Sequence, residues 1–381
     1  MTQVYLDNNA TTRMDERVAA AMLPYMTEIY ANPSSRHQMG RQARAAIDEA
    51  REQVAAAVGA HPSQVLFVSG GTEANNLAIK GLAAMRPAAS VLVSDIEHPS
   101  VRQPVAELQA QGWQLRRMPV DAAGRVAVDE VVASLDRDVG LATLMLANNE
   151  TGVLQDVAKL AERVRAVKGW MHSDAVQALG KLPLDFASLG VHTLSLSSHK
   201  IYGPKGVGAL VFDKRVEFAP LLTGGGHEKG LRAGTENVPA VVGFGLACQL
   251  AVERLPQYAA LAQWRDSLAQ EVVQLGGTVF GMAAARLPNT VFFAFPAIEG
   301  ETLVMELDRQ GFAIASGSAC SSGKTEPSAV LLAMGVEPGL AKGAVRVSLG
   351  RDTRAEDVTE FVRALAGVLQ RLRQMAALVS G

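Results

Sequence analysis

Residues 197–206 read Ser-Ser-His-Lys-Ile-Tyr-Gly-Pro-Lys-Gly, and the interpretation of the whole chain depends on this stretch. Apolar runs precede it at 193–196 and follow it at 208–212, so the stretch is predicted to be a turn between two strands. Lys200 comes just after the first strand, beside small hydroxyl residues, where a side chain can face a cleft. A solvated surface lysine is the alternative, because lysine is rarely buried. The motifs elsewhere in the chain favour the cleft.

Before this turn, apolar runs typical of strands alternate with stretches typical of helices. The predicted strands span residues 65–69, 90–94, 114–119, 141–147 and 170–173. This alternation implies crossover connections and a mostly parallel sheet with helices on its faces. The sequence therefore predicts an α/β fold for this part of the chain.

Five polar side chains lie at or just beyond the ends of the predicted strands. They are Thr72, His98, Asn149, Asp174 and Lys200. Ligands of parallel sheets bind just beyond the carboxyl ends of the strands, so we expect these side chains to meet at one site. This expectation favours a functional lysine over a surface one. For His98 considered alone, a structural hydrogen-bonding role is the alternative.

A lysine amine can form a Schiff base with the aldehyde of pyridoxal phosphate (PLP). Such a site also needs an acid beneath the pyridine nitrogen, a stacking ring and a phosphate cradle, and Asp174 and His98 are candidates for the first two. The segment Gly70-Gly71-Thr72-Glu73 is the candidate cradle. It joins a strand to a helix, where free N–H groups and the helix dipole favour an anion. A bare Gly-Gly turn is the alternative.

The last third of the chain has a different pattern. Strands are predicted at 278–280, 291–295 and 312–315, and helices at 301–310, 327–334 and 355–378. Strands accompanied by helices on one side suggest a small α+β domain. We therefore expect a large domain over 14–256 and a small domain built from 1–13 and 257–381.

Residues 316–325 read Ser-Gly-Ser-Ala-Cys-Ser-Ser-Gly-Lys-Thr. The Gly-Lys-Thr is not part of an ATP-binding P-loop, because Gly317 lies one residue too far back and no strand–loop–helix pattern fits. Small polar neighbours cannot pack as a core, so Cys320 is expected to be exposed and reactive. Cys248 lies within an apolar helix and is expected to be buried.

Composition argues against several classes of function. The 381 residues have a net charge of −2 without a long run of one sign, so neither nucleic acid nor a membrane is expected as a partner. No signal peptide is recognised, and no apolar stretch reaches the roughly 18–20 residues of a membrane span. Two cysteines without a CxxC pair provide neither a disulfide framework nor a Cys-rich zinc site. The protein is therefore expected to be cytoplasmic.

Taken together, these motifs resemble the PLP-dependent cysteine desulfurases of the NifS/IscS group, in the class V aminotransferase family. The matching segments follow the order of that group over essentially the whole chain: YLDNNATT (5–12), NPSSRH (32–37), SGGTEANNLAIKG (69–81), EH (97–98), NNETG (148–152), DAVQALGKLPLD (174–185), SSHKIYGPKG (197–206), GGGHEKGLRAGTEN (224–237), GSACSSG (317–323) and RVSLGR (346–351). The resemblance implies a fold-type I aminotransferase-like fold: a large PLP-binding domain with a mostly parallel central sheet flanked by helices, and a smaller α+β domain carrying a cysteine loop at about 316–326.

The resemblance also implies roles for matching residues. Lys200 would hold PLP and move protons, Asp174 would pair with the pyridine N–H, and His98 would stack on the ring and take part in proton transfer. Gln177 would reach the ring oxygen, and Asn149 the cofactor or the substrate. The cofactor phosphate would be bound by Gly71, Thr72, Ser197 and His199, with Thr235 contributed by the partner subunit of a homodimer.

Two further residues would act on the substrate, free L-cysteine. Arg346 would bind its carboxylate through two parallel hydrogen bonds. The Cys320 thiolate would attack the substrate sulfur, leaving L-alanine and a Cys320 persulfide. The sulfur would pass to an acceptor protein for Fe–S cluster assembly, other thio-cofactors or tRNA thiolation. No metal site is implied, apart from a transient contact of Cys320 with a cluster on that partner.

Two alternatives stay open. Another class V enzyme, such as an aminotransferase or a selenocysteine lyase, would share the cofactor site, although an aminotransferase needs no cysteine on the loop. A non-catalytic sulfur-assembly scaffold derived from an enzyme is the second, although every expected catalytic position is filled. The chain also stops without the longer tail that housekeeping members use to dock the Fe–S scaffold, which leaves the acceptor open.

Overall fold

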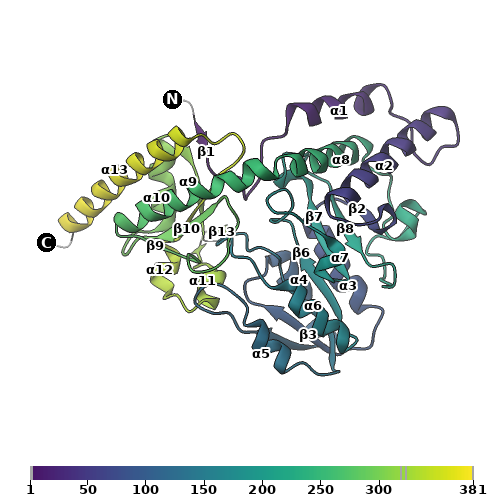
Figure 1. Cartoon of the computed structure of the whole chain (residues 1–381), viewed down its shortest axis with the longest axis horizontal. Helices are drawn as coiled ribbons and strands as arrows, with labels where there is room; N and C mark the ends of the chain where they lie inside the picture. The colour runs from purple at the N-terminus through teal and green to yellow at the C-terminus, as the bar shows by residue number, and fades with distance from the viewer. Residues whose placement is uncertain (1–2, 318–319, 322–323, 380–381) are drawn as a thin grey trace.

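The computed structural model describes residues 3–317, 320–321 and 324–379. For residues 320–321, 324–325 and 376–379 this description covers the backbone and not the side chains. Figure 1 shows two packed units, a large one built on a central sheet and a smaller one that includes the C-terminal helix. The central sheet of the large unit has seven strands among the described residues.

The large sheet is mostly parallel, as the sequence predicts. Its strand order is β2 (Val65–Val68), β8 (Gly208–Phe212), β7 (Thr193–Ser197), β6 (Trp170–Asp174), β5 (Val139–Thr143), β3 (Ser90–Ser94) and β4 (Gln114–Met118). The strands from β7 to β4 pair in parallel, and β8 is antiparallel to both of its neighbours. All seven therefore share one direction except β8, so the carboxyl ends of β5, β6 and β7 meet at one edge.

Helices cover both faces of this sheet. Because successive strand residues face opposite sides, Val65 and Phe67 of β2 pack into the core that contains α2 (Gln38–Ala57) and α8 (Val238–Glu253). Leu66 and Val68 pack into the opposite core. That core contains α3 (Gly71–Ala83) and α4 (Pro99–Ala110). The other elements of this unit are α1 (Glu16–Thr27), α5 (Val128–Ala133), α6 (Val157–Ala166), α7 (Phe186–Leu189), and the short helices η1 (Pro62–Gln64), η2 (Ser198–Lys200) and η3 (His227–Gly230).

The smaller unit contains an antiparallel sheet in the order β12 (Ala315–Ser316), β15 (Val345–Ser348), β10 (Thr290–Ala294) and β9 (Thr278–Val279). This sheet shares a core with α9 (Leu255–Gln274), α10 (Gly300–Arg309) and α13 (Ala355–Val379). The remaining elements are β11 (Phe312–Ala313), β13 (Cys320–Ser321), β14 (Lys324–Thr325), α11 (Ala329–Ala333) and α12 (Pro338–Lys342). In Figure 1, α9 runs from the small unit toward α8 of the large one.

The N-terminal segment joins the two units. Strand β1 (Val4–Tyr5) pairs in parallel with β11, and the backbone N–H of Asn8 donates to the carbonyl of Ser348 at 3.2 Å. Further along, the N–H of Thr12 donates to the carbonyl of His199 at 2.9 Å. Residues 7–11 therefore lie between the small sheet and the turn that contains Lys200.

Several element bounds differ from the predicted ones. The strand predicted over 141–147 ends at Thr143, so Asn149 lies in the loop beyond it and not directly at the strand end. Strand β15 was not predicted, because the polar Arg346 and Ser348 interrupt its apolar residues. The domain boundaries predicted from the sequence stay a proposal.

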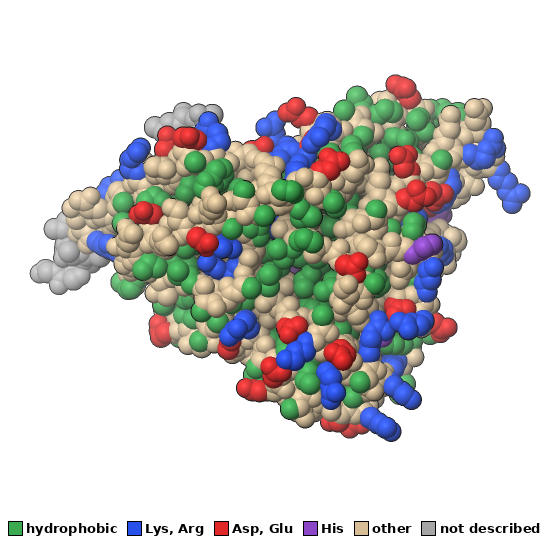
Figure 2. Space-filling model, viewed as in Figure 1, with side chains coloured by type: hydrophobic (Ala, Val, Ile, Leu, Met, Phe, Trp, Pro, Cys, Tyr) green, Lys and Arg blue, Asp and Glu red, His purple; other side chains and the backbone are tan. Residues whose placement is uncertain are grey.

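Basic and acidic side chains are interspersed on the face shown in Figure 2. In the part of the chain that the structure describes, no single helix has the length and apolar character to cross a membrane. Together, α8 and α9 pass this test by length and composition, but the pair is bent by 62° at its break.

Candidate active site

A cavity of about 400 Å³ lies at the carboxyl ends of β5, β6 and β7. Ten residues predicted from the sequence line it: Gly71, Thr72, His98, Asn149, Asp174, Gln177, Ser197, His199, Lys200 and Arg346. Thr235 is exposed and is not among the described residues that line this cavity. Cys320 has its backbone in β13, and its side chain lies outside the description.

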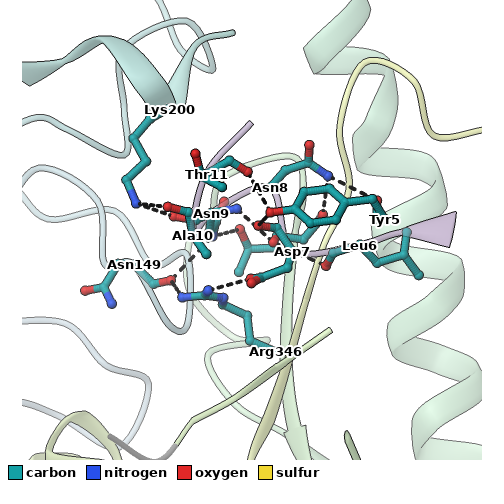
Figure 3. Close-up of polar contacts among 12 residues, drawn as sticks. Tyr5, Leu6, Asp7, Asn8, Asn9, Ala10, Thr11, Asn149, Lys200 and Arg346 are labelled. Carbon is teal, nitrogen blue, oxygen red and sulfur yellow. Dashed lines mark hydrogen bonds and ion pairs between the residues drawn. The ribbon is translucent and has the colours of Figure 1, made fainter. Parts of the chain in front are cut away.

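Lys200 is the last residue of η2, directly after β7. Its Nζ donates to the backbone carbonyls of Asn9 at 2.7 Å and Ala10 at 2.6 Å (Figure 3). Burial lowers the pKa of Lys200 to about 8, and the positive charge of Arg346 acts in the same direction. The amine therefore loses its proton more readily than an exposed lysine, as reaction with a carbonyl group requires.

Backbone geometry fixes the turn after Lys200. Tyr202 has a φ of 68°, in the left-handed region that non-glycine residues rarely adopt. Its N–H donates to the Thr12 hydroxyl at 2.7 Å, and its own hydroxyl lies 2.6 Å from the Tyr258 hydroxyl. These bonds hold the unusual conformation and thereby the direction of the preceding lysine.

Asp174, the last residue of β6, is buried and fully oriented. Oδ1 accepts from the N–H of Val176 at 2.9 Å, and Oδ2 accepts from Nδ2 of Asn75 at 2.7 Å. The same Nδ2 donates to the Ser100 hydroxyl at 2.8 Å, and the Asn75 oxygen lies 3.0 Å from Nε2 of His172. Asn75 thus uses both donors and its acceptor to hold this end of the cavity.

His98 caps the start of α4 and lines the cavity. Its Nδ1 accepts from the N–H of Ser100 at 3.2 Å and lies 2.7 Å from the Ser100 hydroxyl. Burial lowers the pKa of His98, with Asp174 opposing this shift and Lys200 adding to it. The ring is therefore neutral near pH 7, and its apolar faces suit stacking on a planar ligand.

The opposite end of the cavity is formed by the start of α3 and the end of β7. No side chain among the described residues caps α3, so its first N–H groups are available to a ligand. The Ser197 hydroxyl is buried and has no hydrogen-bond partner among the described residues. A Cβ on Gly71 would lie 2.7 Å from Cγ2 of Val176, so any larger residue here would displace the Val176 side chain. This arrangement matches an anion cradle.

Arg346 lies on β15 of the small sheet and lines the cavity. Its Nη1 donates to the carbonyl of Asn149 and its Nη2 to Oδ1 of Asp7, each at 2.8 Å (Figure 3). Its Nε is buried and has no hydrogen-bond partner in the part of the chain that the structure describes. The guanidinium is therefore held in place on two sides, and Arg346 lines the cavity with donor capacity that these two bonds do not use.

The residue-level predictions missed several contributors to this site. The carbonyls of Asn9 and Ala10 accept from Lys200, Asn75 holds Asp174, and Lys181 donates to Asn9 Oδ1 at 2.8 Å and to Gln177 Oε1 at 2.7 Å. The available signal was the polar Asp7-Asn8-Asn9 run directly after an extended lead. For Asn75 and Lys181, the residue type gave no signal, because their roles come from tertiary contacts.

The fold and the cavity define a fold-type I enzyme with a lysine-centred site. The chain matches the family model "Aminotransferase class-V" over residues 4–361, and it belongs to this family. It is 42% identical to a cysteine desulfurase of Sinorhizobium fredii over 387 residues, which cover 100% of both chains. A solved NifS-like protein has a TM-score of 0.91 at 36% identity, covering 97% of this chain and 100% of that one. The solved structure "SspA in complex with cysteine" has a TM-score of 0.82 at 32% identity, covering 91% and 99%.

The cofactor of this family is pyridoxal phosphate, and the described residues fit it. Lys200 supplies an amine of lowered pKa, and Asp174 supplies a buried carboxylate. The uncapped start of α3 and the unpaired Ser197 hydroxyl supply donors for a phosphate. An amine, an acid and an anion cradle are three of the parts that this cofactor requires, and His98 in the cavity lining supplies the fourth, a ring for stacking.

Proposed function

We propose that this protein is a cysteine desulfurase, which converts free L-cysteine to L-alanine and leaves the sulfur as a persulfide on Cys320. The single observation that supports this most strongly is the joint placement of Lys200, Asp174 and Arg346 in one cavity of a class V fold. The relatives that match over nearly the full length of the chain include cysteine desulfurases, and one solved neighbour is SspA in complex with cysteine.

Each end of the cavity would hold one part of the cofactor. PLP, when bound, supplies an electron sink that weakens the bond between Cβ and the sulfur of the substrate. Asp174 would keep the pyridine nitrogen protonated, because its carboxylate is oriented by Asn75 and Val176. Gly71, Thr72, Ser197 and His199 would bind the phosphate. Burial lowers the pKa of His199 to about 4, so its ring is neutral and can donate from one nitrogen only.

Arg346 and Asn149 would bind the substrate. The Arg346 guanidinium lies beside the Asn149 carbonyl and the Asp7 carboxylate, so the carboxylate of L-cysteine would meet a preoriented cation. Lys200, with its lowered pKa, would take the proton from Cα and return one to the product. His98 would stack on the ring and assist proton transfer.

Cys320 would provide the nucleophile. Its thiolate would form a bond to the substrate sulfur while the bond between that sulfur and Cβ breaks, and the Cβ carbon would gain a proton to become the methyl group of alanine. The electrons of the broken bond pass to the organic product, so no external oxidant or reductant is needed for this step.

Two variants test this function. Cys320→Ala should retain the visible absorption of the bound cofactor and form no alanine from L-cysteine, whereas Lys200→Ala should lose the absorption band of the lysine-bound cofactor. Undiminished turnover by Cys320→Ala would favour the rival reading as another class V enzyme. An unchanged absorption band in Lys200→Ala would contradict the assignment of the cofactor lysine.

We also propose a homodimer in which Thr235 of one subunit completes the phosphate site of the other. Thr235 is exposed in the single chain and lies outside its own cavity lining, which supports a role in trans. A hybrid of a Lys200→Ala subunit and a Thr235→Ala subunit would then contain one intact site and regain activity. A hybrid no more active than the Thr235→Ala homodimer would refute contribution across the subunits.

The persulfide sulfur would pass to a protein acceptor, either an Fe–S scaffold or a protein of another thiolation pathway. Persulfide transfer from the sulfur-loaded enzyme to each candidate acceptor, followed by mass spectrometry, would identify it. The cytoplasmic location expected from the sequence stays a prediction.

A further inference from the structure

Lys181 is a buried lysine to which the mechanism above gives no role. The residue is 3% exposed, and its Nζ donates to Gln177 Oε1 at 2.7 Å and to Asn9 Oδ1 at 2.8 Å. No carboxylate pairs with it among the described residues. Burial, assisted by the charges of Lys200 and Arg346, lowers its pKa well below the ordinary value. Burying an amine without a counter-charge costs folding free energy, which indicates that its hydrogen bonds to the two amides serve a function.

The orientation of the Gln177 amide follows from its partners. The Asn9 carbonyl can only accept, so the Gln177 Nε2 that lies 3.0 Å from it donates to it. The amide oxygen then faces the amine of Lys181, which donates to it. Gln177 lines the cavity, and one of its two N–H groups is left for a ligand.

The orientation of Asn9 is fixed in the same way. Asn289 donates to the backbone carbonyl of Leu349 at 3.0 Å and to Asn9 Oδ1 at 3.1 Å. Asn9 Oδ1 therefore accepts from both Asn289 and Lys181, while Asn9 Nδ2 donates to the Thr290 hydroxyl at 2.9 Å. The backbone carbonyl of the same Asn9 accepts from Lys200 at 2.7 Å.

We propose that Lys181 is a positioning residue for the cofactor site: it holds the Gln177 amide with an N–H toward the ring oxygen of PLP, and it holds Asn9 beneath Lys200. The proposal rests on the proposed function, because it assumes that Gln177 reaches the ring oxygen. Lys181 acts through these two residues and touches neither the cofactor nor the substrate. The charges that act on the Lys181 amine are those of Lys200 and Arg346, and Lys200 in turn is influenced by Arg346, Asp174 and Asp7.

A pH titration of the visible absorption of the holoenzyme tests this proposal. Lys181→Met removes the donor while keeping a long apolar side chain, so Gln177 and Asn9 each lose a buried hydrogen bond. A hydrogen bond donated to the ring oxygen withdraws electron density that would otherwise stabilise the protonated chromophore. When this hydrogen bond weakens, the pKa of the chromophore, read from the pH dependence of its absorption band, should rise by about one unit. PLP should also bind about tenfold more weakly, which is the size of effect expected for one hydrogen bond.

Matched variants separate positioning from general damage. Gln177→Leu should produce the same upward shift, and the double variant Lys181→Met/Gln177→Leu should add little to either single one. Lys159→Met, which removes an exposed lysine on α6 that pairs with Asp129, should leave the band unchanged. Should Lys181→Met fail to fold, Lys181→Gln retains an N–H donor and should keep a nearly native pKa.

A native band pKa in Lys181→Met, or shifts that simply add in the double variant, would overturn the proposal. Steady-state kinetics give a second readout: kcat should fall about tenfold, whereas KM for L-cysteine stays within about twofold, since Arg346 is untouched. If the wild-type holoenzyme shows the band but forms no alanine from cysteine, the proposed function fails while the spectroscopic test of Lys181 still stands.

Discussion

The two ends of the cavity differ in how their polar groups are satisfied. At the carboxylate end, formed by Asp174, Asn75, Ser100 and His172, each side chain has hydrogen-bond partners within the protein. At the anion end, formed by the start of α3 with Ser197, no side chain among the described residues caps the helix, and the buried hydroxyl has no partner among them. The protein thus preorganises the first end completely and leaves the second to be completed by a ligand.

This difference has an energetic consequence. A buried polar group without a partner costs about 1–3 kcal/mol, so the anion end destabilises the protein until an anion binds. Binding of a phosphate there should raise the free energy of unfolding as well as anchor the cofactor. The carboxylate end should respond differently, because removing any member of its network leaves other buried groups unpaired.

The largest effect on activity is expected from removing the Asp174 carboxylate, the functional group of the carboxylate end. Asp174→Ala should lower kcat for alanine formation by roughly 10²–10³-fold, because the pyridine nitrogen loses the anion that keeps it protonated. Alanine production from L-cysteine under saturating PLP measures this. Asp185→Ala, which removes an exposed cap of α7, is the control. Equal activity of the two variants would contradict the assigned role of Asp174.

The next largest effect is expected from removing Asn75, which holds the Asp174 carboxylate in place. Asn75→Leu should lower the free energy of unfolding by about 2–3 kcal/mol, because Ser100, His172 and Asp174 lose buried partners together. Denaturant unfolding of the apoprotein measures it. Asn76→Leu is the matched control, since the Asn76 amide donates to the carbonyl of Thr72, within its own helix, and to no other group among the described residues. A stability loss no greater than that of the control would argue against the network.

At the anion end, one substitution should leave the stability of the apoprotein unchanged or higher and should lower its affinity for PLP. Ser197→Ala should leave the apoprotein as stable or slightly more stable, because an unpaired buried hydroxyl is removed, yet weaken PLP binding about tenfold. Ser195→Ala, two residues earlier on β7, also removes a buried hydroxyl that has no partner among the described residues, but this hydroxyl does not line the cavity. It should stabilise the apoprotein similarly without affecting PLP affinity. Identical cofactor affinities in both variants would place the phosphate elsewhere.

A smaller effect is expected from pH. Only a neutral amine attacks an aldehyde, so the rate of PLP incorporation into the apoprotein should rise with pH and level off above the pKa of Lys200, about 8. Because this pKa is lowered in the folded chain, the unfolded chain binds more protons between pH 8 and its ordinary value, and Lys200 makes the apoprotein more stable as pH rises through that window. Absorbance after mixing gives the rate, and a midpoint near 10.5 would contradict the burial of Lys200.

The sequence predicted the residues that follow strands better than those that support them. Thr72, Asp174 and Lys200 could be placed because parallel strands bring their carboxyl ends together whatever the details of packing. Asn75 and Lys181 could not, because a polar residue in a helix or turn acquires its role only from partners remote in sequence. Asp7 and Asn9 belonged to a recognised motif, but their contacts to Arg346 and Lys200 depend on how the N-terminal segment crosses between the units.

The most direct test of the account is one turnover with substrate. Holoenzyme treated with one equivalent of L-cysteine in the absence of an acceptor should form one equivalent of alanine. Mass spectrometry of its peptides should then find one added sulfur atom on the peptide that contains Cys320, and none on the peptide that contains Cys248, which is buried. Alanine formed without sulfur on Cys320, or sulfur added without loss of cysteine, would contradict the proposal that Cys320 attacks a substrate bound at Lys200.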